Sequence, residues 1–103
     1  MLKSEILPVG SVVLLKNSTK KLMIMGLLQA KPEDTKRVYD YCGCVYPEGY
    51  MNSNNLYLFD EEQIERIYYR GFVDSEQEDF VNRVREILPK IYGSRGKTEG
   101  NVQ

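Results

Sequence analysis

Two groups of acidic side chains are the residues whose type and spacing best suit chemistry. Glu61 and Glu62 are adjacent, and a second acidic cluster runs from Glu76 to Asp79. Paired carboxylates can act as a general acid and a general base. Both groups lie where we expect the first turn of a helix, however, and the helix dipole favours acids at that position. We therefore interpret them as helix-start residues.

The rest of the sequence offers little for catalysis. The chain contains no histidine, which is the commonest general base in enzymes. Without it, serine and cysteine nucleophiles lose their usual proton carrier. The sequence also lacks a phosphate-binding glycine loop, a dinucleotide fingerprint and a calcium-loop pattern. We predict that the protein is not an enzyme and uses no cofactor.

The two cysteines are the other reactive side chains. Cys42 and Cys44 are two residues apart in an expected strand. Their side chains then share one face, at a separation too large for ordinary disulfide geometry. A structural zinc site needs four ligands, and the chain has neither a histidine nor a third cysteine to complete one. We predict two free thiols that pack as small apolar side chains, and no metal site.

Tyrosine is the unusual feature of the composition, with eight tyrosines and no tryptophan. A tyrosine offers a rigid apolar ring and a hydroxyl group, and tyrosines are enriched in the hot spots of protein interfaces. We expect strand propensity and core packing to account for about half of them. From the remainder and one nearby acid we predict a protein-binding surface. Its candidate residues are Tyr39, Tyr41, Tyr46, Glu48, Tyr50 and Tyr69.

Five strands would position these residues. Runs of β-branched, aliphatic and aromatic residues predict strands at 11–16, 21–28, 37–46, 56–59 and 66–70. Gly26, inside the second run, indicates a bulge or bend that curls the sheet toward a barrel. Residues 31–35 are expected to form a solvated loop. The segment Tyr46-Pro47-Glu48-Gly49 predicts a type I turn.

The segment that begins at Asp60 carries two competing patterns. Asp60 has N-cap chemistry, and Gln63 can reach back to it, which predicts one helical turn. Beyond this turn, Ile64, Ile67 and Tyr68 recur at helical spacing, whereas the aromatic run around them also fits a strand. We favour the strand.

The last element is predicted to be an amphipathic helix. Ser75 and Glu78 have the spacing of a capping box, so the helix is expected to begin there. Pro89 should distort or end it near Leu88, and residues 93–103 read as a flexible polar tail. The apolar stripe is expected to pack across the open side of the sheet, with docking into another protein as the alternative. Its members are Phe80, Val81, Val84, Ile87, Leu88 and Ile91.

Length and charge restrict the number of domains and the kinds of partner that we expect. A chain of 103 residues fits one domain, which we place at residues 1–92. We predict an α+β fold, in which a small, curled, barrel-like antiparallel sheet of about five strands is packed by the C-terminal helix. The net charge of −1 is too weak to gather phosphate backbones. Because no segment resembles a membrane span or a secretory signal, we expect a cytoplasmic protein that binds neither nucleic acid nor membrane.

Five segments carry a family resemblance, namely Leu7–Leu15, Lys20–Gly26, Tyr39–Gly43, Tyr46–Tyr50 and Gly71–Phe72. Together they resemble a family of small Gram-positive bacterial proteins, the domain-of-unknown-function family 4176. The family is similar in gene setting to accessory proteins of type VII secretion, beside toxins with an LXG-type amino-terminal domain and their small helical partners. The resemblance implies a cytosolic toxin chaperone or targeting factor, and it supplies no catalytic residues.

These observations lead to the hypothesis of a cytosolic accessory or chaperone-type adaptor. Its partner would be an LXG-type toxin, the toxin's small helical companions or another component of a type VII secretion system, with the oligomeric state left open. Two other classes stay open. An immunity protein that neutralises a toxin domain needs the same kind of binding face, and a barrel-like nucleic-acid-binding module could stack bases on exposed tyrosines. The near-neutral charge disfavours the last class.

Overall fold

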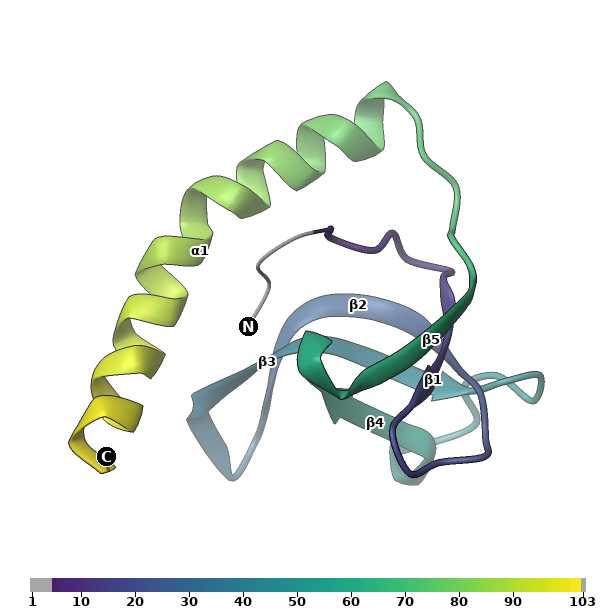
Figure 1. The fold of residues 1–103 in the computed structure, drawn as a ribbon, viewed down its shortest axis with the longest axis horizontal. Helices are drawn as coiled ribbons and strands as arrows, with labels where there is room; N and C mark the ends of the chain where they lie inside the picture. The colour runs from purple at the N-terminus through teal and green to yellow at the C-terminus, as the bar shows by residue number, and fades with distance from the viewer. Residues whose placement is uncertain (1–4, 103) are drawn as a thin grey trace. The chain divides into compact units, whose positions relative to one another are not determined.

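The chain folds as five strands followed by one long helix, as seen in a computed structural model that describes the backbone of residues 5–102 and the side chains of residues 5–91 (Figure 1). This arrangement confirms the predicted α+β class. The strands are β1 (Val12–Leu15), β2 (Leu22–Lys31), β3 (Asp34–Val45), β4 (Leu56–Phe59) and β5 (Ile64–Tyr69). Short 3-10 turns occupy Ser53–Asn55 and Glu61–Gln63, and the helix α1 spans Ser75–Val102.

The strands form one antiparallel sheet in the order β4-β3-β2-β1-β5. This order places β4 and β5 at opposite edges. Because these two strands do not pair with each other in the described part of the chain, the sheet is open and the predicted barrel-like closure is wrong. The bend expected near Gly26 is present two residues later, where Leu28 adopts a left-handed backbone conformation with a φ of 55°.

The hairpin of β2 and β3 is longer than the sequence predicts. The expected loop at 31–35 is reduced to a turn at Pro32 and Glu33, because β2 continues to Lys31 and β3 begins at Asp34. Side chains from Lys31 to Lys36 are exposed. Polar residues are therefore compatible with strand structure here, since this part of the hairpin faces water.

The core of the sheet is built around Val13 and Tyr41, which are fully buried. Val13 pairs with Leu22 on the neighbouring strand. Tyr41 stacks on Phe59 with ring centroids 5.7 Å apart, and its hydroxyl accepts a hydrogen bond of 3.0 Å from the backbone N–H of Leu7. These contacts join the N-terminal segment, β3 and β4 into one apolar cluster.

The cysteines and one glycine of β3 also belong to this packed region. Cys42 and Cys44 are buried free thiols, as predicted. Between them, a Cβ atom on Gly43 would lie 2.7 Å from the backbone oxygen of Met23. Glycine is therefore required at position 43, where β3 closely approaches β2.

A buried serine fastens the end of β5 to the N-terminal segment. The hydroxyl of Ser11 donates to the carbonyl oxygen of Pro8 at 2.7 Å and accepts from the backbone N–H of Gly71 at 3.0 Å. Ser11 and Gly71 are both buried. Their hydrogen bonds satisfy polar groups that would otherwise be buried without partners.

A second polar connection joins β3 to the 3-10 turn before β5. The backbone N–H of Asp40 donates to the carboxylate of Asp60, and the N–H of Glu61 donates to the carboxylate of Asp40. The N–H of Asp60 donates to the side-chain oxygen of Gln63 at 2.9 Å. The helical turn and the reach of Gln63 are therefore confirmed.

The helix α1 begins at Ser75, but its N-cap is the preceding residue. The carboxylate of Asp74 accepts a hydrogen bond of 2.9 Å from the N–H of Gln77. Asp74 therefore caps the helix in place of the predicted box of Ser75 and Glu78.

The buried face of α1 is narrower than the predicted stripe. Val84 and Leu88 are buried, whereas Phe80 and Ile87 are exposed. Of the two predicted effects of Pro89, distortion or an end of the helix near Leu88, the end is wrong, because the backbone stays helical to Val102. A proline inside a helix has no backbone N–H, so one helical hydrogen bond is missing at this position.

The chain divides into two compact units, and the single domain placed at residues 1–92 stays a prediction. The first unit contains the described residues up to Gln29 together with Tyr39–Phe72, and the second contains Ala30–Val38 and the residues from Val73 onward. Residues 93–102, predicted as a polar tail, have helical backbone. The packing of the helix stripe across the sheet and the flexibility of residues 93–103 stay predictions. No helix within residues 5–102 combines the length and the apolar character needed to cross a bilayer.

Candidate protein-binding groove

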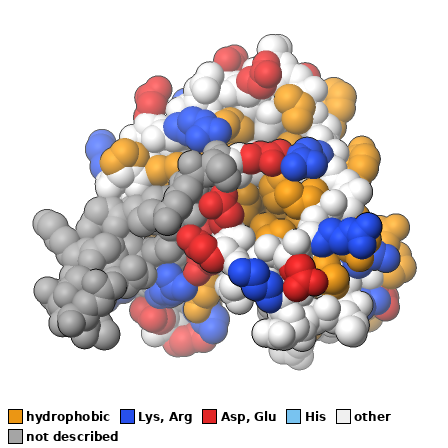
Figure 2. Space-filling model, in the orientation of Figure 1, with side chains coloured by type: hydrophobic (Ala, Val, Ile, Leu, Met, Phe, Trp, Pro, Cys, Tyr) orange, Lys and Arg blue, Asp and Glu red, His pale blue; other side chains and the backbone are white. Residues whose placement is uncertain are grey.

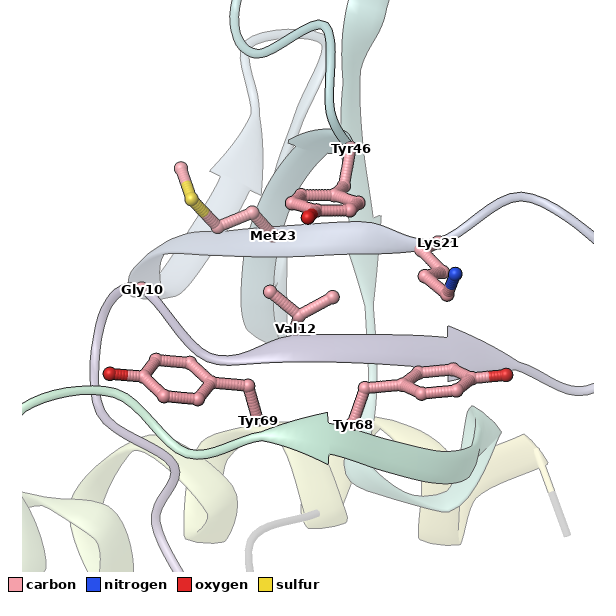
Figure 3. A pocket seen from close by; sticks show the side chains of 7 residues that line it. All are labelled: Gly10, Val12, Lys21, Met23, Tyr46, Tyr68 and Tyr69. Carbon is pink, nitrogen blue, oxygen red and sulfur yellow. The ribbon is translucent and has the colours of Figure 1, made fainter.

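An open groove of about 560 Å³ lies within the first unit (Figure 3). Its volume falls in the range of ordinary ligand-binding pockets. We call it the tyrosine groove, because three of the side chains around it are tyrosines. The groove is lined by Gly10, Val12, Lys21, Met23, Tyr46, Tyr68 and Tyr69.

The two adjacent tyrosines of β5 line the same groove because the strand is bulged. Consecutive side chains of a regular strand point to opposite faces. In the pairing of β1 with β5, Val12 lies opposite Tyr69 and Val13 lies opposite Ile67, so Tyr68 is an extra residue. A bulge of this kind resets the alternation and re-aims a side chain. Figure 3 shows the rings of Tyr68 and Tyr69 extending in opposite directions along β5.

A second irregularity gives β5 a three-residue period. Leu14 pairs with Arg66 and Leu15 pairs with Ile64, which leaves Glu65 as another extra residue. The less exposed side chains of β5 are accordingly Ile64 and Ile67, three residues apart. This spacing explains why the sequence of the segment fits a helix as well as a strand.

The floor of the groove is apolar. Val12 on β1 lies opposite Met23 on β2 in the antiparallel pairing. Val12 also lies opposite Tyr69 on its other side. The floor therefore crosses three neighbouring strands, β2, β1 and β5, whose hydrogen bonds hold its side chains in register.

Tyr46 enters the groove from the end of β3. Its backbone N–H donates to the carbonyl oxygen of Lys21 at 2.9 Å, which fixes the tyrosine beside the start of β2. The turn that follows is not the predicted type I turn. The peptide bond before Pro47 is cis, and the closing hydrogen bond of 2.8 Å runs from the N–H of Gly49 to the carbonyl of Val45.

Two cations lie over the ring of Tyr68. The amino group of Lys21 is 4.8 Å from the ring centroid, and the guanidinium carbon of Arg66 is 4.7 Å from it. Each such contact at an exposed site is worth about 0.5–1 kcal/mol. One side of the groove is therefore positively charged, and among residues 5–91 no carboxylate lines it.

Lys20, the residue before Lys21, forms an ion pair with Glu48, with 2.8 Å between the amino nitrogen and a carboxylate oxygen. This hydrogen-bonded contact lowers the pKa of Glu48. The pair connects the turn after β1 to the turn after β3, and so supports the position of Tyr46 from outside the groove.

The structure brings together two of the six predicted site residues, because Tyr46 and Tyr69 line the groove. Glu48 is connected to it through Lys20. Tyr50 is exposed and Tyr39 is half-buried, and neither lines the groove. The prediction for Tyr41 is wrong, because its side chain is fully buried against Phe59 and is not an exposed contact residue of the groove.

Sequence reasoning missed Tyr68 and Lys21. Regular alternation along a strand places Tyr68 and Tyr69 on opposite faces, so a prediction that includes Tyr69 leaves Tyr68 out. The bulge that brings both to one groove breaks this alternation. The signal that could have found Tyr68 is the three-residue spacing of Ile64 and Ile67, which leaves both tyrosines on the remaining face. Lys21 has no comparable signal, because it is one of three lysines close together in the sequence, with Lys16 and Lys20.

A smaller hollow of about 170 Å³ is lined on the other side of β5 by Ile64 and Ile67, together with Leu7 and Tyr41. Figure 2 shows apolar side chains gathered in a hollow with acidic and basic side chains around it. Beside this smaller hollow, Arg70 and Glu5 form two hydrogen bonds of 2.6 and 3.0 Å. These bonds lower the pKa of Glu5.

The acidic groups considered for catalysis lie at the starts of helical segments. Glu61 and Glu62 belong to the first turn of a 3-10 helix, and Glu76 and Glu78 belong to the first turn of α1. This placement is the one predicted from the helix dipole. In the part of the chain that the structure describes, no group of three or more potential ligands could hold a metal ion.

Comparison with known proteins identifies the family. The sequence model of the family described as domain of unknown function DUF4176 matches residues 6–80, so the chain belongs to that family. No curated protein and no solved structure matches the chain.

Proposed function

We propose that this member of the DUF4176 family is an accessory or chaperone-type adaptor in the cytoplasm, which binds an LXG-type toxin or another component of a type VII secretion system. The class of partner follows from the resemblance of the sequence to proteins encoded beside such toxins. The geometry of the tyrosine groove supports it as the proposed contact surface.

The observation that carries this proposal is the gathering of exposed aromatic rings over an apolar floor. Tyr46, Tyr68 and Tyr69 are 43%, 42% and 60% exposed, respectively, and all three line one groove. Large exposed apolar patches mark sites of interaction. Tyrosines also suit interfaces because each buries a large ring while only two side-chain torsions become fixed.

Binding would work by covering the groove. A partner segment placed over Val12 and Met23 removes apolar surface from water, which contributes about 25 cal/mol for each Å² buried. The tyrosine hydroxyls can remain hydrated at the rim or donate hydrogen bonds to the partner. A client held in this way keeps its own apolar segment away from other chains, and so stays soluble and competent for export.

Affinity capture of the full-length chain tests the proposal. The tagged protein is expressed at its native level in a Gram-positive cell that carries an LXG-type toxin, and bound proteins are identified by mass spectrometry. We expect the toxin, its helical companions or another secretion component to be recovered. Recovery of no secretion-related protein overturns the proposal.

A pair of tyrosine variants tests the surface. Tyr69→Ser should lower recovery of the partner by about tenfold or more, because hot-spot aromatic residues typically contribute 2 kcal/mol or more. The matched control is Tyr57→Ser, since Tyr57 is 44% exposed on β4 and does not line the groove. Equal recovery with both variants excludes the groove as the contact surface.

Survival after toxin challenge separates the adaptor from an immunity protein. Cells that express the isolated toxic domain should not be rescued by this chain. Loss of the chain should instead reduce accumulation or secretion of the full-length toxin. Rescue from the isolated domain would show that the protein is an immunity protein.

A further inference from the structure

The charges around the tyrosine groove are not balanced. Lys21 lines the groove, and Arg66 lies over the ring of Tyr68 that forms its edge. Among residues 5–91, neither cation forms an ion pair. Both are held against an aromatic ring, an arrangement that leaves positive charge available to an incoming anion.

Two other cations in the same unit are paired with carboxylates. Lys20 is only one residue from Lys21, yet it is paired with Glu48 at 2.8 Å. Arg70 is four residues from Arg66 and forms two hydrogen bonds with Glu5. Carboxylates therefore neutralise Lys20 and Arg70, whereas Lys21 and Arg66 at the groove are held against an aromatic ring.

We infer that the protein segment that occupies the tyrosine groove is acidic as well as apolar, with aspartate or glutamate side chains facing Lys21 and Arg66. This inference rests on the proposed function and specifies the chemistry of its partner. Apolar side chains of the segment cover Val12 and Met23, and its carboxylates replace the missing counter-charges. Complementary charge of this kind directs which partner binds and in which orientation.

A protein segment fits these observations better than a nucleic acid. A phosphate backbone needs a row of cations along its path, whereas the groove has two at one side and the chain carries a net charge of −1. The apolar floor of valine and methionine is also suited to aliphatic side chains. Single-stranded DNA is therefore the competing ligand in the test of this inference.

Titration of the full chain with model peptides tests the inference without any cellular partner. The probes are three capped five-residue peptides with the same leucine and phenylalanine residues and, at two positions, glutamate, glutamine or lysine. Binding is followed by nuclear magnetic resonance of the tyrosine rings. The glutamate peptide should shift the signals of Tyr46, Tyr68 and Tyr69 and bind about fivefold or more tightly than the glutamine peptide, with the difference reduced by salt.

Two results would overturn the inference. The first is a glutamate peptide that causes no shift at millimolar concentration or binds no more tightly than its glutamine counterpart. The second is an oligothymidine strand that shifts the same ring signals when the glutamate peptide does not. That second result would assign the groove to nucleic acid.

Charge variants test whether Lys21 and Arg66 cause the preference for the glutamate peptide. The double variant Lys21→Gln and Arg66→Gln should bind the glutamate and glutamine peptides equally. The matched control is Lys36→Gln, because Lys36 is exposed and lies in the second unit. Preference for glutamate that survives in the double variant, or that is lost in the control, contradicts the role given to these two cations.

The same variants separate failure of this inference from failure of the proposed function. In the capture experiment, full recovery of the partner by the double variant and loss of recovery by Tyr69→Ser would refute the acidic segment but keep the adaptor role. Conversely, glutamate preference in the titration with no secretion-related partner recovered from cells would refute the adaptor role but keep the chemistry of the groove.

Discussion

Tyr41 and Tyr69 show how surroundings give two tyrosines different roles. Tyr41 is fully buried and uses its hydroxyl to accept the N–H of Leu7, whereas Tyr69 lies open in the groove. Both occur in strand-forming sequence, so composition alone predicted a tyrosine surface without separating its members from core residues. Tyr46 and Tyr69 were predicted as surface residues for the same reason as Tyr41, namely that tyrosine is enriched in protein interfaces. The burial of Tyr41 depends on contacts with residues distant in sequence.

Alkaline titration tests the burial of Tyr41. Burial raises the pKa of its phenol to about 12, although the hydrogen bond from Leu7 acts in the opposite direction. The unfolded phenol ionises near pH 10, so the folded state binds the proton more tightly. Its contribution to stability is therefore complete below pH 10 and is lost as the pH rises from 10 toward 12. Circular dichroism measures the loss of folded structure, and phenolate absorbance measures ionisation of the tyrosines. Comparison with Tyr41→Phe identifies the part of the absorbance that comes from Tyr41. Ionisation of Tyr41 near pH 10 in the folded protein is inconsistent with its burial.

Acid titration tests the support of Tyr46 by the ion pair of Lys20 and Glu48. The hydrogen bond from Lys20 lowers the pKa of Glu48 below its ordinary value of 4.5. Because the folded-state pKa is depressed, the contribution of this pair is present above pH 4.5 and is lost as the pH falls through the lowered pKa. Carbon-detected magnetic resonance should show that Lys20→Met raises the pKa of Glu48 toward its ordinary value, while the backbone hydrogen bond of Glu48 still lowers it. An unchanged titration in that variant means that the pair does not form in solution.

At the scale of elements, the run of five strands and a helix could be predicted from propensity and turn chemistry. The positions of the strands were less predictable where geometry is irregular. In β5, two extra residues give Ile64 and Ile67 a three-residue spacing that is ambiguous in sequence. In α1, the helix continues through Pro89, although proline is a local signal for the end of a helix. Bulges depend on pairing between strands, which no single segment encodes.

The close approach of β3 to β2 predicts a sensitive glycine. Gly43→Ala should destabilise the protein by about 1–3 kcal/mol, because the added Cβ would meet the backbone oxygen of Met23 at 2.7 Å. Gly26→Ala is the control, since its Cβ would meet side-chain atoms and no backbone atom, namely the sulfur of Cys42 at 3.3 Å and the amide nitrogen of Gln29 at 3.7 Å. Urea unfolding measures both variants. An equal or smaller loss for Gly43→Ala would show that the two strands are not this close.

The N-cap of α1 provides a second test at this scale. Asp74→Ala should reduce helix stability by about 1 kcal/mol, because it removes the oxygen that accepts the N–H of Gln77. Ser75→Ala should have little effect, since Ser75 is already the first helical residue. Thermal unfolding followed by the helical circular dichroism signal compares the two variants. A larger loss of helix stability in Ser75→Ala than in Asp74→Ala would show that Ser75 caps the helix, as the sequence predicts.

At the scale of the whole molecule, the fold class and the family were predictable, and the shape of the sheet was not. Binary patterning and turn residues predict an antiparallel α+β protein. Closure of a barrel depends on whether β4 and β5 meet, which is a property of the complete sheet. The tyrosine groove has the same origin, because it combines β1, β2, the end of β3 and a bulged β5. Its cationic side likewise appears only when Lys21 and Arg66 are placed over the same ring.

Hydroxyl-radical footprinting of the full chain, alone and in complex with its captured partner, tests the binding role of the groove most directly. The tyrosine groove should be covered in the complex. Tyr46, Tyr68 and Tyr69 should therefore lose most of their reactivity, while Tyr57 on β4 should keep its own. Unchanged reactivity of the three groove tyrosines in a complex that protects residues elsewhere would show that the protein binds through another surface.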